Sequence, residues 1–177
     1  MRLFYVFALL LTFTLPAYAT PVSKDMANAY YQNCMAKQDP SFSQESQGFL
    51  CACTAAKMMD NLSIEDMQMM GRQDQSGRDA LNKMIINVYA PCMEHPAREY
   101  HYNQCISNPQ TAQLSGNPQA LCGCMADQIA AHLRTNAQDV FTGILARNPN
   151  ITDPMQALYD DPEFQQFARS KLLGCVR

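Results

Sequence analysis

Eight cysteines are the residues best suited to chemistry in this chain of 177 residues, and their spacing is regular. They are Cys34, Cys51, Cys53, Cys92, Cys105, Cys122, Cys124 and Cys175. Cysteine sulfur can bind a soft metal such as Cu(I), exchange with other disulfides, or form structural cross-links. Catalytic thiols often occur as Cys-x-x-Cys at the start of a helix. Both close pairs here are Cys-x-Cys preceded by leucine, which favours structural disulfides.

Methionines supply further soft ligands and make copper binding an alternative function. Clustered methionines are Met58, Met59, Met67, Met69 and Met70. Methionine is also a flexible core residue, and the cysteines of an exported protein are usually oxidised. Met58 corresponds in the second half of the chain to Ile129, which cannot bind a metal. We therefore predict no metal site and no cofactor, and we keep soft-metal binding as the alternative.

Histidines are the natural candidates for a general base. The chain contains three of them, His95, His101 and His132. No Gly-x-Ser-x-Gly or His-Glu-x-x-His motif accompanies them, and we expect all three to lie on the surface in water. The adjacent Asp160 and Asp161 are more typical of a helix start or a loop than of a general acid and base. We predict that the protein is not an enzyme.

The cysteines follow an internal repeat. Each half contains Tyr-x-x-Cys, then Leu-Cys-x-Cys, then one final cysteine, and in both halves 16 residues separate the first cysteine from the Cys-x-Cys pair. After each pair, apolar residues recur with helical spacing. They are Ala55, Met58 and Leu62 in the first half and Ala126, Ile129 and Leu133 in the second. The repeat predicts two copies of one helical unit.

Two further pairs of positions correspond between the halves. Tyr30 and His101 each stand four residues before the first cysteine of their half. Tyr89 and Leu172 each stand three residues before the last cysteine, on an apolar helical stripe.

We predict an all-α fold with two disulfide-linked tandem units, 20–96 and 97–177, of about four helices each. The expected helices span 25–37, 44–62, 64–72 and 78–91, then 98–107, 117–134, 137–146 and 155–174. Turn residues such as Gly77 separate them. Ser63-x-x-Asp66 and Asn136-x-x-Asp139 have the pattern of a helix start, because their side-chain oxygens can accept from free backbone N–H groups.

Helix geometry restricts how the cysteines pair. Successive residues turn by about 100°, so Cys51 and Cys53 point roughly 200° apart and cannot pair with each other. Pairing within each unit, with the same pattern in both, leaves two alternatives. In the first half these are Cys34–Cys51 with Cys53–Cys92, or Cys34–Cys53 with Cys51–Cys92.

Residues 1–19 have the pattern of a secretory signal peptide. Arg2 supplies the positive charge, Leu3 to Leu15 form an apolar run, and Ala17-Tyr18-Ala19 resembles a cleavage site. The run is too short to span a hydrocarbon core of ~30 Å, and we expect no transmembrane segment in the mature chain. The predicted location is the periplasm or the extracellular space.

Binding is the function that remains. The net charge is −3 and no Lys/Arg cluster occurs, which argues against nucleic acid as a partner. We expect a binding or interaction protein with a cleft at the junction of the two units and an unknown protein as its partner. A small apolar ligand bound between helices is an alternative. Tyrosine suits contact surfaces, and Tyr30, Tyr31, Tyr100 and Tyr102 are paired between the halves.

The mature chain is expected to begin at Thr20, with an intact mass about 8 Da below that of the fully reduced form, because each of four disulfides removes two hydrogen atoms. Intact mass spectrometry before and after reduction measures this difference. Free thiols in the untreated protein, or stoichiometric Cu(I), would favour the metal alternative instead.

Overall fold

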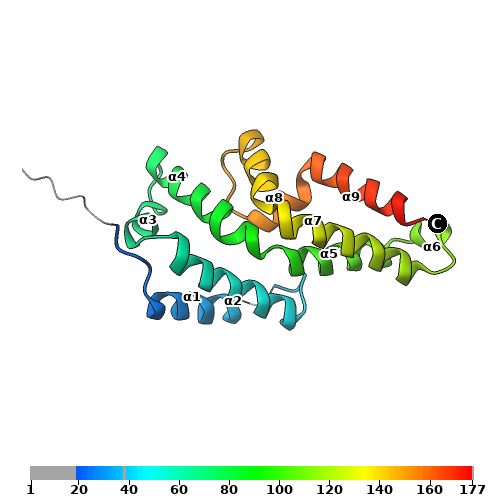
Figure 1. Cartoon of the computed structure of the whole chain (residues 1–177), viewed down its shortest axis with the longest axis horizontal. Helices are drawn as coiled ribbons and strands as arrows, with labels where there is room; N and C mark the ends of the chain where they lie inside the picture. Colours follow the sequence, from blue (N-terminus) through cyan, green and yellow to red (C-terminus); the bar gives the residue numbers. More distant parts are fainter. Residues whose placement is uncertain (1–18, 38, 177) are drawn as a thin grey trace, which may run out of the picture.

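The computed structural model describes residues 19–37 and 39–176, and this part of the chain contains helices and no β-strand (Figure 1). The all-α prediction is confirmed. Residues 1–18 of the predicted signal peptide lie outside the described residues. The helices are α1 (Lys24–Ala36), α2 (Gln44–Asn61), α3 (Ile64–Met69), α4 (Gln75–Met84), the π-helix η1 (Ile85–Tyr89), the 3-10 helix η2 (Ala90–Cys92), α5 (Glu94–Ser107), α6 (Thr111–Leu114), α7 (Pro118–Arg147), α8 (Pro154–Asp160) and α9 (Pro162–Cys175).

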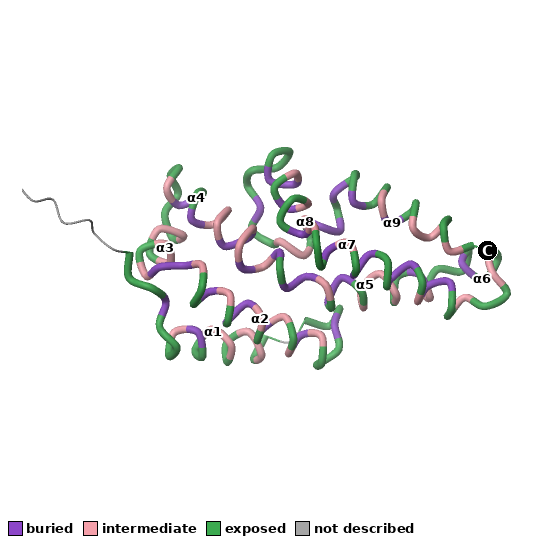
Figure 2. Tube along the Cα trace, viewed as in Figure 1, coloured by how far each residue is buried: buried purple, intermediate pink, exposed green. Residues whose placement is uncertain are grey.

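The long helices pack side by side in a series. Helix α2 lies against α1, α5 against α2, α7 against α5, and α9 against α7 (Figure 1). Buried residues recur along α7, whereas the chain turns at the ends of the helices are mostly exposed (Figure 2). Across residues 19–37 and 39–176, no helix combines the length and the apolar character needed to cross a bilayer.

One continuous core crosses the boundary that the sequence predicts between the units. It extends from Phe42 and Ile85 through Met93 and Ala97 to Phe164. Helix α5 begins at Glu94 and therefore contains residues of both predicted units. The division into two units remains a prediction.

Side-chain caps start several helices of the first half. Ser23, Ser43 and Ser63 each accept a hydrogen bond from the backbone N–H three residues later. At Ser63 the arrangement is reciprocal, because the carboxylate of Asp66 accepts from the Ser63 N–H at 2.8 Å. Lys83 donates to the same carboxylate at 2.6 Å. The helix start predicted at Ser63 is confirmed.

The helix start predicted at Asn136 is wrong, because α7 continues through this residue for 30 residues in all. Asn136 donates its side-chain N–H to the carbonyl oxygen of His132, one turn earlier, at 3.0 Å. The apolar stripe continues from Leu133 to Ala137 and Phe141, which are all buried. An unbroken helix keeps this stripe in the core.

The single helix predicted over 155–174 is also wrong, since the chain forms α8 and α9 with a break at Asp161. Asp161 accepts from the N–H of Phe164 at 2.9 Å, and Pro162 occupies the first position of α9. Arg147 also binds the Asp161 carboxylate, at 2.8 and 3.0 Å. Aspartate followed by proline is a sequence signal for such a start.

The helix predicted over 78–91 begins earlier, at Gln75. Asp74 caps α4, so Gly77, expected in a turn, lies within its first turn. A Cβ at Gly77 would lie 2.1 Å from the carbonyl oxygen of Arg72, and only glycine tolerates this approach.

All eight cysteines form disulfides, so the prediction of cross-links is confirmed. The bonds are Cys34–Cys51, Cys53–Cys92, Cys105–Cys122 and Cys124–Cys175. The pairing is the first of the two alternatives, in both halves. Helix α2 is joined to α1 and η2, and α7 is joined to α5 and α9.

The Cys124–Cys175 bond should be the first to open under mild reduction. Thiol exchange requires access to a sulfur atom, and Cys124 is exposed, whereas each other bond contains at least one buried cysteine. Stepwise reduction with alkylation and peptide mapping measures the order. Labelling of Cys105 and Cys122 before Cys124 and Cys175 would contradict this expectation.

Candidate functional site

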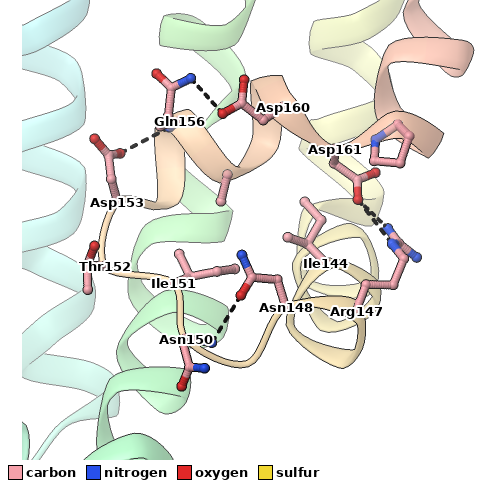
Figure 3. Close-up of a pocket in the computed structure, with 12 residues that line it drawn as sticks. Ile144, Arg147, Asn148, Asn150, Ile151, Thr152, Asp153, Gln156, Asp160 and Asp161 are labelled. Carbon is pink, nitrogen blue, oxygen red and sulfur yellow. Dashed lines mark hydrogen bonds and ion pairs between the residues drawn. The ribbon is translucent and has the colours of Figure 1, made fainter.

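A polar hollow of about 400 Å³ lies beside the loop that joins α7 to α8 (Figure 3). Its charged groups already have partners within the protein. Asp161 accepts from Arg147, and Asp160 accepts from the side chain of Gln156 at 2.8 Å. Asp153 accepts from the N–H of Gln156 and caps α8. These contacts leave few groups of the hollow available to a ligand.

A second hollow, of about 350 Å³, lies between α2 and α5, where the sequence predicts a cleft between units. The carboxylate of Glu99 accepts from the N–H and the hydroxyl of Ser43, both at 2.8 Å. The rings of Phe49 and His95 lie 4.0 Å apart, centroid to centroid. Burial opposes ionisation of Glu99, but the hydrogen bonds from serine outweigh it and lower the pKa. This hollow is therefore largely a polar contact between two helices.

A third hollow has a different character, and we name it the aromatic cavity. It has a volume of about 360 Å³ and lies between α5, α7, α8 and α9. Tyr100 and His101 come from α5, Met125 from α7, Tyr159 from α8 and Leu172 from α9. Its volume lies within the range of small-molecule sites, about 300–1,000 Å³, and such sites are mostly apolar with a few polar groups.

His101 occupies an aromatic environment in this cavity. Tyr100 stacks on Tyr159 with centroids 3.6 Å apart. The imidazole lies edge-on to both rings, at 5.4 Å from Tyr100 and 5.7 Å from Tyr159. Phe164 lies 5.6 Å away on another side. Burial lowers the pKa of His101 to about 4, so the ring is neutral at pH 7.

The buried ring nitrogen of His101 has no partner. Its Nε2 atom forms no hydrogen bond with any described residue. An unsatisfied buried polar atom costs about 1–3 kcal/mol. Such an atom in a native protein calls for an explanation, and a functional site is one.

The corresponding positions of the first half are joined by a hydrogen bond. Tyr30, which corresponds to His101, has its hydroxyl 2.8 Å from that of Tyr89. Tyr89 corresponds to Leu172, which cannot form a hydrogen bond. Burial raises the pKa of Tyr89, so its hydroxyl stays protonated. The second half therefore replaces a hydrogen-bonded pair by two residues that both line the cavity.

The expectation of surface histidines holds only in part. His95 is exposed, and His132 is half-buried with its ring 4.2 Å from that of Phe167. His101 is also half-buried, but its Nε2 atom is fully buried. Sequence reasoning also missed Tyr159 and Arg169 as lining residues. The spacing of apolar residues on helix α5 did not indicate that His101 lines a cavity. Its aromatic neighbour Tyr159 comes from α8, which is far away in the sequence.

The alternative of soft-metal binding lacks thiolate donors in this structure, because every cysteine is in a disulfide. Met58 packs with Met67, Met70 and Met84 in a second apolar cluster. Among the described residues, no group of three His, Cys, Asp or Glu side chains is arranged to hold a metal ion. These methionines act as core residues.

Comparison with known proteins assigns no function. No protein family, curated protein or solved structure matches this chain. The geometry of the aromatic cavity is therefore the basis for a functional proposal.

Protein stability should fall between pH 6.5 and pH 4 because of His101. Its pKa is about 4 in the folded protein, whereas an unperturbed histidine has a pKa of 6.5, so the unfolded chain binds more protons in this window. The free energy of unfolding should decrease by at most about 3 kcal/mol as the pH falls through the window. Urea unfolding of the oxidised protein, followed by circular dichroism, measures it.

His101→Phe removes the titrating group and keeps an aromatic ring. The dependence of unfolding free energy on pH should become shallower in this variant, and His95→Gln is the control for loss of an exposed imidazole. An unchanged slope in His101→Phe would show that other groups cause the acid sensitivity.

Proposed function

We propose that this protein is an exported, non-enzymatic binding protein whose ligand is a small apolar molecule held in the aromatic cavity. The observation that carries the proposal is the contrast between the two halves. Where Tyr30 and Tyr89 bind each other, His101 and Leu172 border a cavity and leave a buried nitrogen unsatisfied.

The walls of the aromatic cavity suit an apolar ligand. Met125 and Tyr159 are buried in the protein and supply apolar surface, while Leu172 is half-buried. Transfer of apolar surface from water into such a cavity is worth roughly 25 cal/mol per Å². The neutral imidazole and the amides of Gln104 and Asn108 add a few polar groups, as is usual for sites that orient a small ligand.

The non-enzymatic part of the proposal is supported by the surroundings of the histidines. The hydrogen bond of His132 is to Asn136, and the rings of His95 and His101 contact aromatic residues. A histidine base normally lies within hydrogen-bond reach of a nucleophile and an orienting group. None of the described contacts has this form.

Export is supported by the disulfides. Four disulfides in one chain are typical of proteins that function in an oxidising compartment, such as the periplasm or the extracellular space. We infer that the cleaved chain works in one of these two compartments.

Binding of an uncharged apolar probe tests the proposal. We expect phenylnaphthylamine, whose fluorescence rises in apolar surroundings, to bind the oxidised full-length mature protein saturably. The double variant His101→Tyr/Leu172→Tyr should abolish this binding, because it recreates the tyrosine pair of the first half within the cavity. Leu172→Phe, which adds bulk without a polar group, should weaken the binding.

Thr152→Tyr is the matched control, because it adds the same side chain to the polar hollow of Figure 3. It should bind the probe as the wild type does. Disulfide mapping and circular dichroism verify the fold of each variant. Failure of the wild type to bind the probe, or equal binding by the double variant, would overturn the proposal.

A further inference from the structure

We propose that the ligand of the aromatic cavity is a small amphiphile with an apolar body and one carboxylate head group, and that Arg169 binds this head group. The inference rests on the proposed function, since it names the class of ligand for the same cavity.

Arg169 is the one lining residue of the cavity with a permanent charge. It lies on α9, three residues before Leu172, and its side chain is exposed. A guanidinium group presents several N–H donors in a plane, and they match the two oxygens of a carboxylate. The cavity therefore combines apolar wall residues with one cationic group.

Arg169 differs from the other described arginines in having no partner among the residues that the structure describes. Four arginines form ion pairs with carboxylates: Arg72, Arg98, Arg134 and Arg147. Arg78 donates to the side chain of Gln75 at 3.1 Å. Arg169 forms neither an ion pair nor a hydrogen bond within residues 19–37 and 39–176. Its charge is thus available to a ligand.

The helix that carries Arg169 has few acidic residues, in a protein whose net charge is −3. Glu163, in the first turn of α9, is bound to Arg147 at 2.8 Å. From Phe164 to Cys175 the helix contains no acidic residue. Among the lining residues there is no carboxylate either. Because the whole molecule repels anions weakly, selective binding of a carboxylate requires a local cation, and Arg169 provides it.

Because His101 is neutral, it adds no charge to the lining of the aromatic cavity. Arg169 is the one cation among the lining residues at pH 7, so one negative charge on the ligand is matched. A second ionised group on the ligand would lie near the apolar walls without a partner, which costs free energy. The structure therefore favours monoanions over dianions.

A competition assay with matched ligands tests the inference. Naphthoate and naphthamide share one apolar body and differ in charge, and decanoate and decanamide form a flexible aliphatic pair. We expect each carboxylate to displace phenylnaphthylamine from the wild type at a concentration about tenfold lower than its amide, the size of one hydrogen-bonded charge contact. The two pairs together show whether a flat aromatic or an aliphatic body fits better.

In Arg169→Gln, the amide and the carboxylate should displace phenylnaphthylamine at about the same concentration, so the ratio of these concentrations falls to about one. The probe itself should still bind. Arg169→Lys should keep part of the ratio, because it keeps the charge and loses the paired donors. Lys171→Gln is the matched control, because Lys171 lies over the ring of Phe167, 4.9 Å from its centroid, and does not line the cavity. It should keep the wild-type ratio.

The outcomes separate the two proposals. If the probe binds and the carboxylates have no advantage, or if the advantage persists in Arg169→Gln, the carboxylate inference is overturned and the binding function stands. If the probe does not bind the wild type at all, the binding function itself fails.

Discussion

Two cysteines separated by one residue on an α-helix point in nearly opposite directions, and this constraint governs both halves of the molecule. Helix α2 is bonded to α1 through Cys51 and to η2 through Cys53. Helix α7 is bonded in the same way to α5 and α9. Each bond closes a loop worth about 3–4 kcal/mol of unfolded-state entropy, and a domain has a net stability of only about 5–15 kcal/mol. The cross-links are therefore comparable with the whole stability of the fold.

Local patterns in the sequence predict the helices but not where a long helix is interrupted. Ser63 and Asn136 have the same capping pattern, yet only Ser63 begins a helix. At Ser63 the interruption is stabilised by the start of the described chain, where the N–H of Val22 donates to Leu62 at 3.2 Å. The backbone carbonyl oxygen of Thr20 accepts a hydrogen bond from the N–H of Ile64, the residue after Ser63, at 2.8 Å. These contacts come from residues about 40 positions away, so a local pattern cannot contain them.

The candidate site was only partly predictable for a similar reason. The sequence places Leu172 on an apolar stripe, and in the structure this residue is half-buried. It also identifies Tyr30 and His101 as corresponding positions. The enclosure of His101 depends on Tyr159, and Tyr159 reaches it because the chain breaks at Asp161 and directs α8 away from α9. A prediction that joins α8 and α9 into one helix loses this contact, although Asp161-Pro162 carries the signal for the break.

The disulfides of the second half also make an open cavity tolerable. A cavity in a core lowers stability because its walls lose contacts, by about 24 cal/mol per Å³ where the cavity is empty and enclosed. The aromatic cavity is open to solvent, and Cys105–Cys122 and Cys124–Cys175 hold its α5, α7 and α9 walls together covalently. The helices therefore do not need to fill the space between them in order to stay in place. The first half has the corresponding bonds, and there the hydroxyls of Tyr30 and Tyr89 form a hydrogen bond in addition to the cross-links. Because the cross-links of the second half hold its helices without such a hydrogen bond, His101 and Leu172 can border a cavity there.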